Sequence, residues 1–174
     1  MATTWHCHIA VSLDGRIARA DGSFDWLEPY PPEEYGLAAF VERVDAILMG
    51  RATYEAVRRM GEWPHPGKRT VVVTRRPLDG APPGVEARGG DMAAIAAEIE
   101  ERGCRRVWIE GGGQVIRQML AIGKVDVLEM ALIPRVLGGG IALFPDGTPE
   151  TALRLLSCTP RSGGALHLVY GRAA

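Results

Sequence analysis

The sequence has little cysteine, no long apolar run and no excess of charge, and each shortage excludes a class of protein. Its three cysteines, Cys7, Cys104 and Cys158, are too few and too far apart for a disulfide framework or a zinc site, so we expect reduced thiols and a cytoplasmic protein. The 20 basic and 21 acidic residues leave a net charge of −1, which gives no general attraction to nucleic acid or to a membrane surface. No stretch has the length of a membrane-spanning helix, and the first residues lack the basic start and apolar run of a signal peptide.

Several catalytic motifs are also missing. There is no Gly-x-Ser-x-Gly elbow and no His-x-Glu followed by Pro-Cys-x-x-Cys, which argues against an α/β-hydrolase and a zinc-dependent deaminase. The stretch 61–68 has five residues between its glycines where a P-loop needs four, and two prolines interrupt it. The glycines at 111–113 match only part of a Rossmann fingerprint, because Ile116 stands where the third glycine belongs.

The order of the expected elements predicts an α/β fold in a single domain, 1–174. Apolar runs predict strands at 4–11, 45–49, 69–74, 107–109 and 124–133, and two further strands at 151–159 and 166–172. Helices are expected from Pro32 to 44, from 50 to about 60, after Asp91 as N-cap, and from the glycines at 111–113 to Gly123, with 78–90 as a connection. We therefore expect a mixed, mostly parallel sheet with helices on both faces and a C-terminal antiparallel hairpin.

Three of the expected strands are followed by residues suited to phosphate binding. Gly50, Arg51 and Thr53 follow the second strand, Thr74 and Arg75 follow the third, and three glycines at 111–113 follow the fourth. Glycine leaves backbone N–H groups open to an anion, and arginine beside a hydroxyl suits an isolated phosphate. The carboxyl ends of neighbouring parallel strands meet at one edge, so these turns predict a site for a pyrophosphate with a further phosphate, which describes NADPH better than NADH.

Two histidines near the N-terminus raise the question of a metal. His6 and His8 share one face of the first expected strand. No third ligand of suitable type lies near them in the sequence, so we expect a structural role for both and no metal site.

Five motifs, in this order and spacing, resemble the dihydrofolate reductase superfamily over nearly the whole chain. The most similar group is the stand-alone proteins that resemble the reductase half of the riboflavin-biosynthesis deaminase-reductase. The motifs are SLDGRIA at 12–18, LMGRATYE at 48–55, VVVTR at 71–75, IEGGGQVIRQML at 109–120 and LGGGIALFP at 137–145.

The resemblance implies a dihydrofolate-reductase-type sheet of about eight strands, NADPH as cofactor, and roles for matching positions. The Ala10 backbone, Ile17 and Ala18 would meet the nicotinamide, and Gly111–Gly112 matches a peptide bond that is often cis in the family. A homodimer through the late strands is also implied. The resemblance also implies three sets of phosphate contacts. Gly50, Arg51 and Thr53 would hold the phosphates, and Thr74 and Arg75 would hold the 2′-phosphate. The pyrophosphate would be held by Gly112, Gly113, Gln114 and Val115.

The substrate side of the resemblance leaves alternatives open. An acid at the start of the first helix binds the pterin in dihydrofolate reductases, and counting back from Gly50 places Glu34 there. Glu33 and Glu34 equally suit the positive end of a helix, and Asp14 is either a site residue or a turn former. The other acids in reach of this position are Asp25, Glu28 and Glu33.

The resemblance therefore predicts an NADPH-dependent reductase of a heterocyclic small molecule, most like 5-amino-6-(5-phosphoribosylamino)uracil reductase. A true dihydrofolate reductase is the first alternative, and an NADP-binding protein without catalysis is the second. GRATYE at 50–55 replaces the longer motif with which the riboflavin enzymes hold the ribose phosphate.

Overall fold

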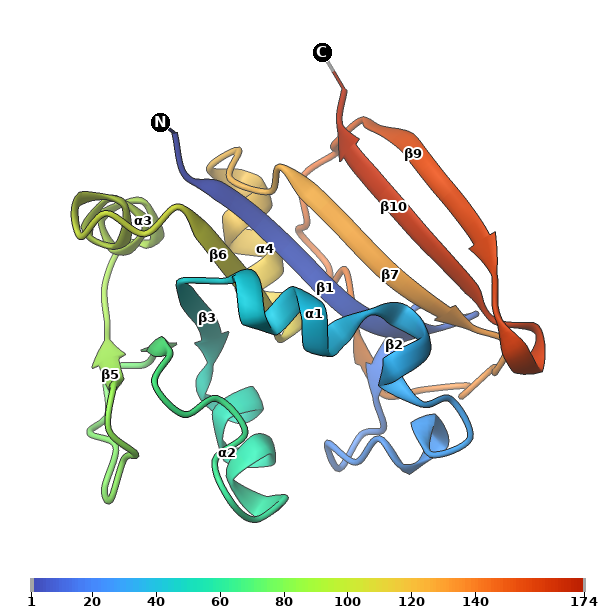
Figure 1. Ribbon diagram of the computed structural model, residues 1–174, viewed down its shortest axis with the longest axis horizontal. Helices are drawn as coiled ribbons and strands as arrows, with labels where there is room; N and C mark the ends of the chain where they lie inside the picture. Colours follow the sequence, from blue (N-terminus) through green and yellow to red (C-terminus); the bar gives the residue numbers. More distant parts are fainter. Residues whose placement is uncertain (1, 174) are drawn as a thin grey trace.

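One mixed sheet organises the molecule. In the computed structural model, which describes residues 2–173, its eight strands lie in the order β5-β4-β3-β6-β1-β7-β10-β9 (Figure 1). The strands from β5 to β7 run parallel, whereas β10 is antiparallel to both β7 and β9, as expected from the sequence. The strands are β1 (Thr4–Ser12), β3 (Ala46–Gly50), β4 (Arg69–Val73), β5 (Val85–Arg88), β6 (Arg106–Gly111), β7 (Val127–Ile133), β9 (Leu153–Pro160) and β10 (Leu166–Arg172).

Helices cover both faces of this sheet, which confirms the expected fold class. The apolar sides of α3 and α4 pack on one face with Trp5 and Ile109, and those of α1 and α2 pack on the other with Ile47 and Trp108. None of the helices within residues 2–173 has the length and apolar content needed to span a bilayer. The helices are α1 (Leu37–Arg43), α2 (Arg51–Arg59), α3 (Met92–Glu101) and α4 (Gly113–Ala121).

Local signals explain where the helices begin and end. Asp91 caps α3, because its side chain accepts a hydrogen bond from the Ala94 N–H at 3.0 Å. The helix expected from Pro32 is instead divided. Pro32–Tyr35 forms a 3₁₀ turn, η2, and α1 begins only after Gly36, which has φ of 68°. Left-handed backbone at Gly36 ends one helical segment and starts the next, so the expectation of one continuous helix is wrong.

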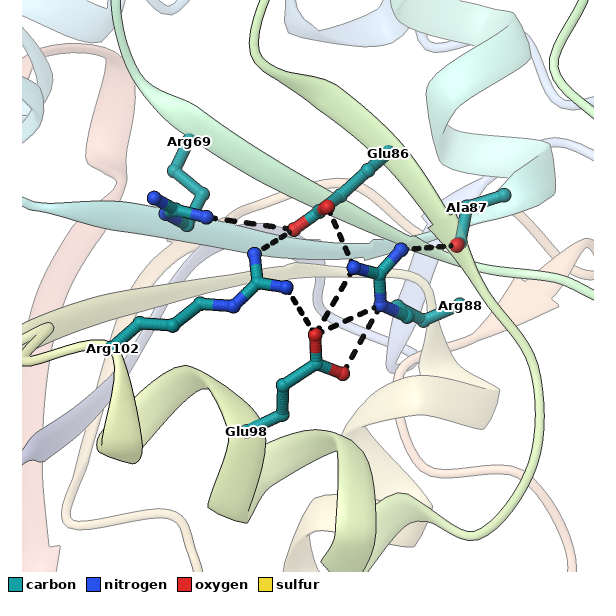
Figure 2. Close-up of polar contacts among 6 residues, drawn as sticks. All are labelled: Arg69, Glu86, Ala87, Arg88, Glu98 and Arg102. Carbon is teal, nitrogen blue, oxygen red and sulfur yellow. Dashed lines mark hydrogen bonds and ion pairs between the residues drawn. The ribbon is translucent and has the colours of Figure 1, made fainter.

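The expectation that 78–90 is only a connection is also wrong, because it contains β5. Figure 2 shows what holds this polar edge strand. Glu86 on β5 accepts from Arg102 at 2.6 Å and from Arg88 at 2.7 Å, and Glu98 on α3 binds both of these arginines. Its four residues, Val-Glu-Ala-Arg, alternate apolar and polar, but this pattern is short and follows a stretch rich in glycine and proline. The strand is held by pairing with β4 and by charges from a later helix.

A second, two-stranded sheet lies beside the start of α4. It pairs β2 (Arg16–Ala18) with β8 (Ile141–Ala142), antiparallel. Two glycines allow other segments to approach this small sheet closely. A Cβ on Gly113 would lie 2.3 Å from the Ala142 carbonyl oxygen, and a Cβ on Gly140 would lie 2.3 Å from the Ala18 carbonyl oxygen. Further 3₁₀ turns are η1 (Asp25–Leu27) and η3 (Ser162–Gly164).

Candidate active site

The three turns expected to bind phosphates end neighbouring strands. β4, β3 and β6 are adjacent and parallel, so their carboxyl ends meet at one edge of the sheet (Figure 1). The turns after β3 and β6 touch: a Cβ on Gly50 would lie 3.8 Å from the Gly112 nitrogen and 3.3 Å from the Val115 side chain. The peptide bond Gly111–Gly112 is cis, as the resemblance implied.

Two helices begin at this edge with free N–H groups. Gly50 is the N-cap of α2 and Gly112 is the N-cap of α4, and neither helix start has a hydrogen-bonded side-chain cap. Without such a cap, the first N–H groups that make no backbone hydrogen bond are available to an anion. In α4 the N–H groups of Val115 and Ile116 already donate to the Gly112 carbonyl oxygen, so the available groups precede them. The Thr53 hydroxyl and the Ile17 side chain border Gly112, since a Cβ built there would lie 3.5 Å and 3.6 Å from them.

An arginine connects the turn after β3 with the turn after β4. Arg51 Nη1 lies 3.5 Å from Thr74 Oγ1 and donates to the Pro77 carbonyl oxygen at 3.1 Å, while its Nε donates to Glu55 at 2.7 Å. Arg75 is exposed at the rim of a shallow hollow between the ends of β4 and β5. That hollow is lined by Thr74, Arg75, Arg76, Pro77, Ala87, Gly89 and Gly90.

The other expected cofactor positions surround the start of α4. Ala10 is half-buried on β1, and Ala18 is buried in β2, where it pairs with Ile141 of β8. Gln114 is exposed in the first turn of α4, whereas Val115 is buried in the core and its N–H donates to the Gly112 carbonyl oxygen at 3.0 Å. The expected contact of Val115 with the pyrophosphate stays a prediction.

The expected catalytic acids are occupied elsewhere. Glu34 accepts hydrogen bonds from the Ser162 N–H and Oγ, at 3.2 and 2.5 Å, and thereby holds the turn before β10. Asp14 accepts from Ser12 Oγ at 2.7 Å and from the Leu137 and Gly138 N–H groups at 3.0 and 2.9 Å. The Ser12 hydroxyl, followed by these backbone N–H groups, lowers the pKa of Asp14 to about 2, so it holds no proton near neutrality.

Of the alternative acids, Asp25 pairs with Arg19 at 2.7 Å, and Glu28 and Glu33 are exposed. This geometry favours supporting roles for Asp14 and Glu34 over proton donation. Their assignment as catalytic residues remains a prediction.

The sequence analysis gave no role to Glu110, which is better placed. Glu110 follows the buried residues of β6 and directly precedes the Gly111–Gly112 peptide. Its side chain is 13% exposed, Oε1 lies 3.4 Å from His65 Nε2, and Oε2 has no hydrogen-bond partner within residues 2–173. His65 contacts both Glu110 and the ring of Trp108, so the two side chains lie on the same side of β6. The sequence signal that could have identified Glu110 is its position as an acid between the apolar run 107–109 and the glycines at 111–113.

The expectation that no third ligand lies near His6 and His8 is wrong, whereas their expected structural role stays a prediction. Potential ligands do lie beside His6 and His8, because β7 and β10 bring Glu129 and His167 to the same face. His6 Nε2 is 2.7 Å from Glu129 Oε2, and His167 Nε2 is 2.7 Å from Glu129 Oε1. Burial lowers the pKa of His8 to about 4. Burial alone would raise the pKa of Glu129, but the surrounding histidines hold it at about 2, so this carboxylate stays ionised.

The chain is similar to a known protein family over nearly its whole length. The family model described as the RibD C-terminal domain matches residues 4–166. The Bacillus subtilis protein YwjB is 36% identical over 168 residues, which span 95% of this chain and 96% of YwjB. A putative riboflavin biosynthesis protein from Shewanella sp. PV-4 has a crystal structure that superposes with a TM-score of 0.87 at 28% identity, over 98% of this chain and 99% of that one.

A more distant solved structure shows the shared fold alone. Dihydrofolate reductase from Enterococcus faecalis, complexed with NADP(H) and RAB-propyl, superposes with a TM-score of 0.71 at 22% identity. The match covers 98% of this chain and 97% of that one. The fold is therefore of the dihydrofolate reductase type.

Proposed function

This chain belongs to the RibD C-terminal domain family, and from that premise we propose that it is an NADPH-dependent reductase. The substrate would be a pyrimidine- or pterin-like heterocycle, most like 5-amino-6-(5-phosphoribosylamino)uracil. The observation that carries the proposal is the meeting of three phosphate-suited turns at the carboxyl ends of β4, β3 and β6.

The residues at this edge fit NADPH. The N–H groups at the starts of α2 and α4 suit the pyrophosphate, with Gly50 and Gly112 leaving room for close approach. Thr53 and Arg51 stand beside them. The hollow after β4 suits the adenosine 2′-phosphate, because Thr74 offers a hydroxyl and Arg75 a free guanidinium at its rim.

Bound NADPH would supply a hydride from its nicotinamide ring. The chain's own task is to hold that ring and the substrate in contact and to exclude water. We assign the ring contact to the Ala10 backbone and to Ile17, which borders Gly112. We assign to the Glu110 carboxyl group the donation of the proton that the substrate takes up on reduction. His65 orients this carboxyl group.

Two other functions remain as alternatives. The fold is shared with dihydrofolate reductase, so dihydrofolate is the second candidate substrate. GRATYE at 50–55 lacks the longer ribose-phosphate motif of the riboflavin enzymes, and this difference is the reason for keeping dihydrofolate as a candidate beside the uracil. An NADP-binding protein without catalysis would keep the three turns and would not need Glu110.

The cofactor assignment is tested by titrating NADPH and NADH against the wild type and Arg75→Ala. We expect the wild type to prefer NADPH, and Arg75→Ala to weaken NADPH binding about 10- to 100-fold with little change for NADH, because a charge-assisted contact to phosphate contributes about 1.5–3 kcal/mol. Arg154→Ala, an exposed arginine on β9, is the matched control. An equal loss for both cofactors would refute the role of Arg75, and a wild-type preference for NADH would refute the cofactor.

The substrate is tested by following NADPH oxidation with the phosphoribosylamino-uracil, with dihydrofolate, and with a panel of cyclic imines and carbonyl compounds. Turnover of the uracil supports the first proposal, and turnover of dihydrofolate alone supports the second. Tight NADPH binding without turnover of any compound would favour the non-catalytic alternative.

A further inference from the structure

A cluster of three histidines and one carboxylate lies on the sheet face covered by α1. His6 and His8 come from β1, Glu129 from β7 and His167 from β10. These strands are neighbours in the sheet and lie side by side in Figure 1. One ligand atom from each of His8, Glu129 and His167 lies within 4.8 Å of the other two.

Strand register accounts for the convergence. His8 stands directly opposite Glu129 in the parallel β1–β7 pair, and His6 stands opposite Val127, two residues earlier on β7. Across the antiparallel β7–β10 pair, His167 stands opposite Ala131, two residues beyond Glu129. Side chains two residues apart on a strand share a face, so all three imidazoles surround one carboxylate.

The polar atoms of this cluster are not fully used by the protein. His8 Nδ1 is buried 4.0 Å from Glu129 Oε2, and His6 Nε2 approaches the same oxygen to 2.7 Å. His8 Nδ1 has no hydrogen-bond partner among the described residues, whereas His6 Nε2 is paired with the carboxylate. Buried imidazole nitrogens without a partner are costly, whereas nitrogens aimed at a shared anion suit a bound cation.

We propose that this cluster is a binding site for a divalent transition metal ion of the zinc class. His8, Glu129 and His167 provide two imidazole nitrogens and one carboxylate oxygen, a donor set that zinc and its neighbours accept and that magnesium and calcium do not favour. His6 holds the second carboxylate oxygen and so orients the ligand. Three protein ligands leave a position for water or another small ligand.

Arg161 regulates access to one of the ligands. Its Nη2 lies 3.2 Å from His167 Nδ1, and because a guanidinium only donates, Nδ1 must accept. The proton of the neutral ring then stands on Nε2 and is donated to Glu129 Oε1 at 2.7 Å. When a metal binds Nε2, the single proton of the neutral ring stands on Nδ1 instead. Nδ1 can then no longer accept a hydrogen bond from Arg161, so Arg161 must turn away. The metal and Arg161 therefore compete for His167.

The site is separate from the cofactor turns. Two strands link it to them. His8 lies two residues before Ala10 on the same face of β1, a distance of about 7 Å along a strand, and its carbonyl oxygen accepts a hydrogen bond from Trp108 Nε1 on β6 at 3.1 Å. The proposal does not depend on NADPH or on reductase activity, and its test measures metal binding alone.

The experiment measures binding of Zn²⁺ and Co²⁺ to protein freed of metal by a chelator, in a Cys158→Ser background that removes the exposed thiol. Calorimetry gives affinity and stoichiometry, and the visible spectrum of bound Co²⁺ reports the coordination. We expect one ion per chain, a Co²⁺ spectrum of low-coordinate nitrogen and oxygen ligands, and no thiolate band.

Variants then locate the ion. Glu129→Gln and His167→Gln should each weaken Zn²⁺ binding by about 100-fold or more, and His6→Gln by about 10-fold, as expected for ligands and for a residue that orients one. Arg161→Gln should strengthen binding, because the competing donor is removed. His65→Gln changes the remaining histidine, outside the cluster, and should leave the affinity unchanged.

Several results would overturn the proposal. If the wild-type protein binds no ion when one equivalent is added, the proposal is overturned, and this result does not depend on whether any variant folds. A thiolate band places the ion on a cysteine, and undiminished affinity in folded Glu129→Gln and His167→Gln places it elsewhere. Circular dichroism of each variant establishes that it is folded before its affinity is compared.

Discussion

At the scale of single residues, Glu110 and Glu34 are competing candidates for the acid of the proposed reaction. Glu34 uses both carboxylate oxygens on Ser162, whereas Glu110 is largely buried with one oxygen unpaired among residues 2–173. A group that gives up a proton must reach the substrate, and only Glu110 stands at the carboxyl end of β6 beside the cofactor turns.

We therefore predict that Glu110→Gln lowers kcat about 10²- to 10⁴-fold, since an amide cannot transfer the proton. NADPH affinity and Tm should change little, because the substitution preserves shape. Steady-state kinetics and a cofactor titration check both. Glu34→Gln is the matched comparison, with a much smaller loss of kcat expected. If Glu34→Gln loses more activity than Glu110→Gln, Glu34 and not Glu110 is the proton donor.

At the scale of elements, Asp14 joins the turn after β1 to the loop after β7. Its carboxylate accepts from Leu137 and Gly138, and the contact stabilises the fold only while Asp14 is ionised. Hydrogen bonds from Ser12 and this loop lower its pKa from 3.8 to about 2. A lowered folded-state pKa means that the stabilisation is complete above about pH 4 and is lost as pH falls toward 2.

The prediction for Asp14→Asn is a Tm a few degrees below that of the wild type at pH 7, with the difference shrinking between pH 4 and pH 2. Thermal unfolding followed by circular dichroism across this pH range checks it. Asp79→Asn, at an exposed loop position, should show no such pH-dependent difference. A Tm difference for Asp14→Asn that persists unchanged at pH 2 would show that another interaction had been lost.

The elements that the sequence revealed are those whose signals are local. β3, β4 and the centre of β6 are apolar runs buried on both faces, and Asp91 and Gly103 mark the ends of α3 as expected. β5 was missed because Glu86 and Arg88 gain their stability from α3. The interruption at Gly36 was missed because its left-handed backbone depends on the path of the chain to the following helix.

At the scale of the whole molecule, the candidate site depends on the order of the strands in the sheet. The three phosphate-suited turns were found from sequence because each carries its own glycines or arginines, and parallel strands align their ends. The cluster around Glu129 was missed because its members come from three strands that are far apart in the sequence and meet only through the registers of β1, β7 and β10. Glu110 was missed because a single acid before a glycine turn is a weak signal by itself, and the burial of its side chain is seen only in the structure.

The outer edge of the sheet leads to a prediction about assembly. β9 is the last strand in the order and pairs only with β10, and Leu155 and Leu156 are 51% and 47% exposed on it. An exposed edge strand with apolar side chains favours pairing with another chain. We therefore expect a homodimer formed through β9.

Leu156→Glu should shift the molar mass measured by light scattering from dimer toward monomer, because it places charge in the interface. Met60→Glu adds the same charge at an exposed apolar position on the far side of the sheet and should leave the mass unchanged. A monomeric wild type at all concentrations, or a Leu156→Glu protein that stays dimeric, contradicts the expectation.

The position of β1 has a consequence for synthesis on the ribosome. This strand is translated before the other strands of the sheet, yet Thr4 pairs with Arg106 on one side and His6 with Val127 on the other. Its two neighbours emerge about a hundred residues later. The nascent N-terminal segment, including Trp5 and the two histidines, must therefore wait unpaired while β3, β4 and β5 can already assemble, and it closes the sheet only when the second half of the message has been read.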